Sequence, residues 1–293
     1  MKRFAITFLI ILFTVSLAAP VFAATWFIAS DGSGDQPTIQ DGINAASNGD
    51  TVLVGPGTFT GVGNYDIDFS GKAIAVVSQF GPASTTVDCQ SNGRGFIFDS
   101  GETSSSVLQG LTITNAYSAV QGGAIWVDNT SPEICNNVLF ANHAVGHGGG
   151  IGIKKGTPYV HNNTLVENSS DALGGGIALQ SSAAPLIHQN IIAFSSAGAG
   201  IACIGGVNPT VSCNDIYGNA GGDGFCGTDG GGNGSTDPQF CGVTGSGYLY
   251  IQSDSPCAPG QSICGSLVGA LGVNCFTVPT EENTWGAIKE LFQ

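Results

Sequence analysis

Apolar residues in this chain recur in short alternating runs, without the sustained spacing of long amphipathic helices. Four such runs follow one another between residues 122 and 204, and each is opened by glycines. Alternation is typical of a strand that buries one face. We therefore expect four strands with the inward pairs Ile125/Val127, Ile151/Ile153, Ile177/Leu179 and Ile201/Cys203.

Prolines mark the repeat that contains these strands. Four of them are spaced 26, 27 and 24 residues apart, and a β-branched residue follows each one two positions later. A fixed period of this size is typical of a solenoid, and a β-branched column suits strands stacked with these side chains inward. The pattern predicts an all-β, right-handed, single-stranded parallel β-helix. The prolines are Pro132, Pro158, Pro185 and Pro209, and the column is Ile134, Val160, Ile187 and Val211.

Asparagine forms two more columns with the same period. Asn tolerates left-handed backbone, and its amide can bond to the same amide one coil away, so the columns mark turns of a parallel stack. Between the columns, Leu139 and Phe140 are both apolar, and the pattern does not tell which of them faces inward. The first column is Asn137, Asn163, Asn190 and Asn214; the second is Asn115, Asn142, Asn168 and Asn219, interrupted by Ser195.

The ends of a parallel coil need covering because they expose unpaired backbone. Upstream, Ile39, Ile43 and Ala46 follow i, i+4, i+7 spacing, which predicts an N-terminal amphipathic helix over the first coil. Downstream, the glycine-rich stretch 221–235 and a cysteine-rich segment up to Cys275 predict an irregular end.

The two termini predict an exported protein. A basic start, an apolar run and a small-residue site before Ala24 indicate a signal peptide over residues 1–23. The β-helix domain then spans residues 24–275, and no later segment is apolar enough to cross a bilayer. Residues 276–293 form a linker and a short helical tail, either a sorting signal or a helix docked on the cap. We expect a secreted protein or one on the extracellular face of the cell surface.

The negative charge of the chain limits the classes of partner that it can bind. Without residues 1–23 the chain has five Lys and Arg against 21 Asp and Glu, a net charge of −16, which excludes nucleic acid as a partner.

The nine cysteines predict disulfides and at least one unpaired thiol. We favour a Cys226–Cys241 bridge and one bridge among Cys257, Cys264 and Cys275. Because no CxxC pair is present, we expect no metal site, and we expect no cofactor.

These features resemble the pectin-lyase-like right-handed β-helix superfamily over roughly residues 25 to 275. The stretch from Asp31 through Pro37-Thr38-Ile39-Gln40 to Thr58-Phe59 is similar to the usual opening of that group. Asp237-Pro238-Gln239-Phe240 and Ser255-Pro256-Cys257 look like the way many bacterial secreted members close. The superfamily includes lyases, hydrolases, esterases, adhesins and surface proteins, so the resemblance implies a fold rather than an activity.

Catalytic signatures are sparse. In the superfamily, the lyase base resembles an Arg or Lys on the central coils. Here Arg94 precedes the regular repeat, and Lys154-Lys155 are better placed but suit a solvated turn. A polygalacturonase-like hydrolase needs paired carboxylates; Gly146-His147-Gly148 matches one of its tripeptides, but the other motifs are missing.

One outward column is a candidate binding surface. If the Ile134 column points inward, Glu133, Tyr159, His161 and His188 point outward on adjacent coils. This ladder can bind a sugar or hold a metal, or it can be a hydrogen-bonded surface without a ligand. Trp126 is the other candidate for stacking on a sugar, unless it packs beneath a loop. Lys154 is a further ligand-binding candidate.

Two classes of function remain after these considerations. The first is a noncatalytic protein that binds polysaccharide or another cell-surface component along the coil. The second is a polysaccharide lyase or glycoside hydrolase. The scarcity of basic residues and of paired carboxylates in the repeat favours the first class.

Overall fold

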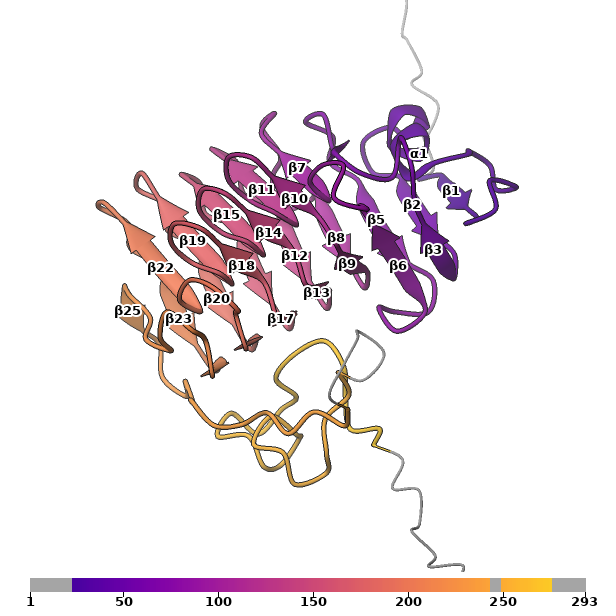
Figure 1. Ribbon diagram of the computed structural model, residues 1–293. Coiled ribbons are helices and arrows are strands. Elements are labelled where there is room, and N and C mark those ends of the chain that lie inside the picture. The colour runs from indigo at the N-terminus through magenta and orange to yellow at the C-terminus, as the bar shows by residue number, and fades with distance from the viewer. Residues whose placement is uncertain (1–22, 243–248, 276–293) are drawn as a thin grey trace, which may run out of the picture.

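The structure is a computed structural model that describes residues 23–242 and 249–275. The predicted signal peptide, apart from its last residue, and the predicted tail lie outside the described residues. Within them the chain winds into a coil of short parallel strands, which confirms the predicted parallel β-helix (Figure 1). None of the described helices is long and apolar enough to span a membrane.

Sheet A is the longest wall of the coil and contains the Ile134 column. Each of its strands pairs in parallel with the strands one coil before and after it. The register joins Ile134 to Val160, then to Ile187 and Val211, as the proline frame predicts. The strands are β1 (Thr25–Ile28), β2 (Thr51–Val54), β5 (Ala75–Ser78), β8 (Val107–Gln109), β12 (Glu133–Cys135), β16 (Tyr159–His161), β20 (Leu186–His188), β23 (Thr210–Ser212) and β25 (Thr228–Asp229).

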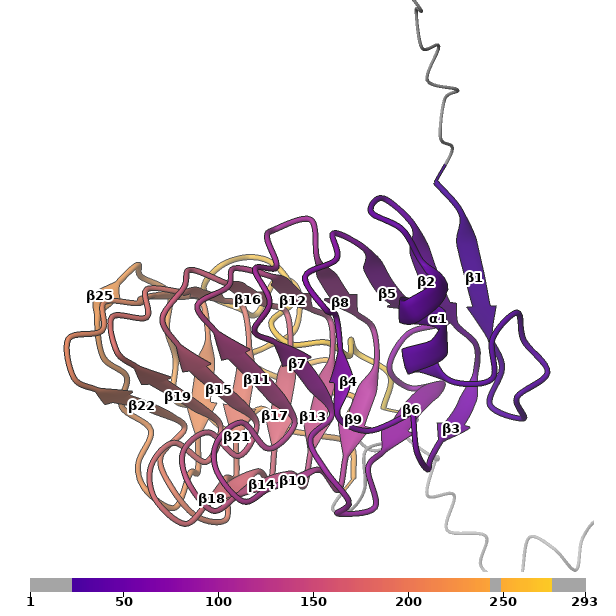
Figure 2. The same cartoon turned by 90° about the horizontal axis from the view of Figure 1, so that it is seen from above.

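Three more sheets complete the coil, which Figure 2 shows from above. Sheet B contains β3 (Gly57–Phe59), β6 (Thr85–Asp88), β9 (Thr112–Thr114), β13 (Val138–Phe140), β17 (Thr164–Val166), β21 (Ile191–Ala193) and β24 (Asp215–Tyr217). Sheet C contains β4 (Ile67–Asp68), β7 (Phe96–Phe98), β11 (Ile125–Asp128), β15 (Ile151–Lys154), β19 (Ile177–Gln180) and β22 (Ile201–Ile204). The short sheet D contains β10 (Tyr117–Ser118), β14 (His143–Ala144) and β18 (Ser169–Ser170).

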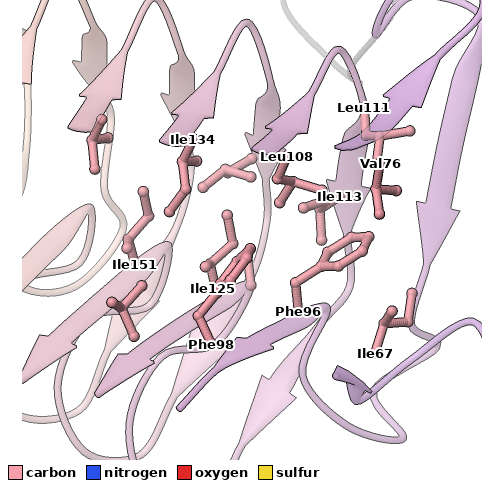
Figure 3. Close-up of a cluster of buried hydrophobic side chains, with 14 of the residues drawn as sticks. Ile67, Val76, Phe96, Phe98, Leu108, Leu111, Ile113, Ile125, Ile134 and Ile151 are labelled. Carbon is pink, nitrogen blue, oxygen red and sulfur yellow. The ribbon is translucent and has the colours of Figure 1, made fainter. Parts of the chain in front are cut away.

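The interior of the coil is a continuous apolar core. Ile125 and Ile151 of sheet C extend toward the same interior as Ile134 of sheet A (Figure 3). Leu139 and Leu165 of sheet B belong to this core, whereas their neighbours Val138, Phe140 and Val166 belong to a separate cluster on the outside. The ambiguous strand therefore buries Leu139 inward and also covers its outer face.

The first asparagine column is a buried ladder of amides. Asn163 Nδ2 donates to Asn190 Oδ1 at 3.0 Å, and Asn190 Nδ2 donates to Asn214 Oδ1 at 2.9 Å. The left-handed residues are the ones directly before the ladder, such as Asn162 with φ 52° and Gln189 with φ 55°. The amide stacking is as predicted, but the left-handed backbone lies one position before the stacked asparagines.

The second column needs a similar correction. Asn142 Nδ2 donates to Asn168 Oδ1 at 3.0 Å, so these two form a ladder. Asn115 is not in register with them, because Ala116 is the residue whose N–H donates to Asn142 Oδ1. Asn115 instead has φ 52° and belongs to the column of left-handed turn residues.

The N-terminal end carries the predicted amphipathic helix, α1 (Ile39–Ala45). Thr38 caps it by accepting a hydrogen bond from the Asp41 N–H. Ile39, Ile43 and Ala46 are all buried, which is the face that the i, i+4, i+7 spacing predicts. The helix packs against β1 and β2, the first strands of sheet A.

The C-terminal end folds back along the outside of the coil. We call residues 235–242 and 249–275 the strap. It runs beside sheet B (Figure 1), where Leu249 and Leu271 pack on Val138 and Val166. Further along, Ile251, Ala258 and Val268 pack on Ile191 and Ala193. This packing explains why sheet B is apolar on both faces.

The disulfide pairing differs from the preferred one. The bridges are Cys203–Cys226, Cys213–Cys264 and Cys241–Cys275, so Cys226 and Cys241 do not pair with each other. The physical reason is the strap, which brings Cys264 next to β23 of the coil. Cys89, Cys135 and Cys257 are free and buried.

Candidate functional site

The outward positions of sheet A carry the predicted residues on adjacent strands. Glu133 is in register with Tyr159, and Cys135 is in register with His161 and then His188. Because strands β12, β16 and β20 are consecutive neighbours, these side chains lie on one face at the spacing of adjacent strands. The structure thus brings Glu133, Tyr159, His161 and His188 together.

His161 is held on three sides. Its Nε2 lies 3.1 Å from Glu133 Oε1, and its Nδ1 lies 3.0 Å from Asn162 Oδ1. The ring of Tyr159 stacks on the imidazole with centroids 4.0 Å apart. Burial, followed by the negative charge of Glu133, raises the pKa of the Tyr159 hydroxyl. The imidazole therefore has a fixed orientation.

Cys135 is a member of this ladder that sequence reasoning did not single out. Its thiol, one carboxylate oxygen of Glu133 and one ring nitrogen of His161 all lie within 4.8 Å of one another. Burial, with the charge of Glu133, raises the pKa of Cys135 to about 12. The signal that could have found it is its position two residues after Glu133, on the same face of a strand.

His188 lies one coil further and has a different environment. Its Nδ1 is 2.8 Å from Ser212 Oγ, and it has no carboxylate partner among the described residues. Burial and the neighbouring His161 lower the pKa of His188. A neutral imidazole at this position is suited to accept or donate one hydrogen bond.

Trp126 and Lys154 lie on sheet C, away from the ladder of sheet A. Trp126 is half-buried, and its indole fills the space above Gly152, where a Cβ would stand 3.0 Å from the ring. Lys154 Nζ lies 3.1 Å from Asp128 Oδ2 in a partly exposed ion pair. The structure places neither residue with Glu133 or His161.

A pocket of about 430 Å³ lies between sheet B and the strap. The coil supplies Phe140, Val166, Glu167 and Phe194, and the strap supplies its other wall. Glu167 and Phe194 have φ 57° and 55° and follow β17 and β21, so the left-handed turns hold them at the edge of sheet B. The strap residues that line the pocket are Asp237, Gln239, Phe240, Gly242, Leu249 and Gln252.

The pocket combines aromatic rings with polar groups. Phe194 lies between two other rings, with centroids 5.7 Å from Tyr217 and 6.4 Å from Phe240. Gln239 Oε1 is buried and lacks a hydrogen-bond partner among the described residues. Two carboxylates, Glu167 and Asp237, line the same space. Such a mixture of rings and a few polar groups is typical of small-ligand sites.

Sequence reasoning missed this pocket. Its two walls are more than 40 residues apart in the chain, and the strap has no repeat that would place it on the coil. The paired apolar residues of sheet B, such as Leu139 and Phe140, were the available signal. They indicated that something covers the outer face of that sheet, without telling which segment does so.

Comparison with known proteins gives a family match over part of the chain. Residues 100–232 match the family described as "Protein of unknown function (DUF1565)". No curated protein matches the chain. Among solved structures, the chain is similar to "Pectin methylesterase from Carrot", with a TM-score of 0.34 and 12% identity over 85% of this chain and 95% of that one. The parallel β-helix that the pectin-lyase-like resemblance implies is the fold observed.

Proposed function

We propose that this is an exported, noncatalytic β-helix protein that binds carbohydrate in the pocket between sheet B and the strap. The observation that carries the proposal is the pocket itself, about 430 Å³ lined by three phenylalanines and by carboxylate and amide side chains. Its volume falls within the range of small-ligand sites. Three disulfides support export, because such bonds persist in oxidising compartments.

A sugar suits this lining for two reasons. A pyranose ring has apolar C–H faces that can pack on Phe194 and Phe240, whose rings are tilted by 61° and so present two differently oriented surfaces. Its hydroxyls can donate to Glu167 and Asp237 and can pair in both senses with the amide of Gln239. The net negative charge of the chain favours neutral or basic sugars over polyuronates.

Binding is tested with a glycan array, followed by calorimetry on the sugars that bind. The Phe240→Ala variant removes a ring from the pocket wall, and we expect its affinity to fall about tenfold or more. Phe80→Ala is the matched control, because Phe80 is 65% exposed and does not line the pocket. Equal affinity of the two variants, or binding of no glycan by the parent chain, would contradict the proposal.

A second function is favoured by one observation, the two carboxylates on the same pocket. Glycoside hydrolases use a pair of Asp or Glu side chains on either side of the scissile bond. Glu167 and Asp237 approach one space from the coil and from the strap, a pairing that the repeat alone does not contain. Release of reducing ends that is lost in both Glu167→Gln and Asp237→Asn would make the protein a hydrolase and would overturn the noncatalytic proposal.

A lyase has less support. Lys154 is paired with Asp128 on sheet C, and Arg94 Nε donates to the Gln121 carbonyl at 2.9 Å. Neither residue lines the pocket. Incubation with uronate polymers, monitored for unsaturated product, tests this reading, and we expect no product from the parent chain.

A further inference from the structure

We infer that Glu133, Cys135 and His161 form a binding site for a thiophilic divalent cation such as Zn²⁺ on the outer face of sheet A. The three side chains come from two adjacent strands, β12 and β16, and their ligand atoms lie within 4.8 Å of one another. This inference is independent of the sugar pocket, and it differs from our expectation that the chain has no metal site.

The donor set is the first step of the argument. A thiolate, an imidazole and a carboxylate are the three types of side chain that bind Zn²⁺, at about 2.3, 2.0 and 2.1 Å respectively. Donor atoms around such an ion are separated by about 3 to 4 Å. The 3.1 Å between His161 Nε2 and Glu133 Oε1 falls in that range, and Cys135 is within 4.8 Å of both. Small rotations of the side chains bring all three to one ion.

The second step is the orientation of His161. Asn162 Nδ2 donates to the Leu267 carbonyl of the strap at 3.3 Å, which turns Asn162 Oδ1 toward His161 Nδ1. Donation from Nδ1 to Asn162 Oδ1 leaves Nε2 facing Glu133, where it either donates an N–H to the carboxylate or, without that proton, offers a lone pair to a cation. Metal-bound histidines are oriented in this way by a hydrogen bond from the opposite ring nitrogen. A cation between Nε2 and the carboxylate takes the place of the proton that the two groups otherwise share.

The third step is the state of Cys135. It remains unpaired although six other cysteines in the described residues form bridges. The thiol is buried, and the Glu133 carboxylate is among the groups that lie close to it. A bound cation supplies the positive charge that a thiolate requires at this position. Three protein ligands leave a fourth position for water or an external ligand.

The site is tested with Co²⁺, whose spectrum reports a thiolate ligand. The disulfide-intact chain is treated with a chelator, kept free of oxygen and titrated with Co²⁺ and then Zn²⁺. We expect one equivalent of Co²⁺, a thiolate-to-cobalt charge-transfer band and displacement by Zn²⁺. Cys135→Ser should abolish the band, whereas Cys257→Ser, which removes another free buried thiol, should retain it.

Two further variants test the site without removing the thiol, so that a loss of binding is not confused with a loss of folding. Glu133→Gln keeps the thiol and the fold but removes the carboxylate, and we expect at least about a 100-fold loss of affinity. Asn162→Gly keeps the left-handed backbone and removes the bond to His161, with an expected loss of about 10- to 100-fold. Gln189→Gly is its control, because Gln189 has the same backbone conformation and bonds Ser266 of the strap, not His161. Absence of the band in the parent chain, or its retention in Cys135→Ser, would overturn the inference.

Discussion

The Oδ1 atom of Asn190 accepts two hydrogen bonds from Asn163, one from the backbone N–H at 2.9 Å and one from Nδ2 at 3.0 Å. The same pattern occurs one coil earlier, where Asn163 Oδ1 accepts the N–H of Asn137 at 3.0 Å. The ladder therefore satisfies backbone groups as well as side chains at a buried turn. From Asn137 to Asn214, its steps join residues that are 26, 27 and 24 positions apart in the chain.

Substitution of Asn163 by Ala should be strongly destabilising. The variant deprives the buried Asn137 N–H of its acceptor, Asn163 Oδ1, and removes the bond from Asn163 Nδ2 to the Ile134 carbonyl at 2.8 Å. We expect the free energy of unfolding to fall by about 2–5 kcal/mol. Denaturant unfolding measures this, with Asn208→Ala on the surface as a control that should change it by less than about 0.5 kcal/mol. Equal effects would show that the ladder adds nothing.

Gly149 is required by the close approach of two coils. A Cβ on Gly149 would overlap the carbonyl oxygen of Ser169, which belongs to the backbone of β18 and cannot rotate away. We expect Gly149→Ala to reduce the free energy of unfolding by about 3 kcal/mol. Gly206 is the matched control, since nothing lies within 4 Å of its Cβ position. Thermal melting of both variants checks the difference, and a Gly149→Ala melting temperature equal to that of the parent would contradict it.

The Cys213–Cys264 bridge should hold the strap on the coil. It closes a separation of 51 residues, and its replacement by two serines should cost about 2–4 kcal/mol. Because the strap covers Val138 and Val166, loosening it should also expose apolar surface. We expect faster protease cleavage within the strap and stronger binding of a hydrophobic dye.

The matched control removes the Cys203–Cys226 bridge, which joins two parts of the coil, by replacing both cysteines with serine. It should lose stability, but protease cleavage within the strap should remain slow. If both double variants are cleaved there at the same rate, the bridge to Cys264 is not what fastens the strap.

Asp215 should make the fold less stable as the pH rises. Burial, the largest cause, raises its pKa above the ordinary 3.8, although it accepts hydrogen bonds from the Thr236 N–H and the Cys257 thiol. The folded chain then retains a proton that the unfolded chain has released, so stability falls as the pH rises from the unfolded pKa through the folded one. Above that window the loss is complete.

Asp215→Asn removes this contribution while keeping the acceptor for Thr236. We expect the melting temperature of the variant to exceed that of the parent at about pH 7, with the difference shrinking toward about pH 4. Asp229→Asn is a control at an exposed position in β25. A constant difference across the pH range would show that Asp215 does not titrate in this window.

The outward side chains of sheet A show how much of a site can be predicted from residues that recur with the period of the coil. Tyr159, His161 and His188 were expected side by side because a parallel register makes equivalent positions neighbours. His161 also contacts Glu133, which lies on the preceding strand two positions before the residue in register with it, and the nearby Cys135 was not chosen as a candidate. Side-chain length and rotamer decide such diagonal contacts, and neither is visible in a column.

By itself, the sequence determined the coil, its period, its inward columns and the helix over its first turn. The physical reason is that each strand of a parallel coil pairs with the strand one period away. The register of the strands can therefore be read from the repeat in the sequence. Only the tertiary structure decided the disulfide pairing, the outer face of sheet B and the pocket. These depend on the strap, which has no repeat, and Cys264 or Phe240 meets the coil only after the chain has turned back on itself.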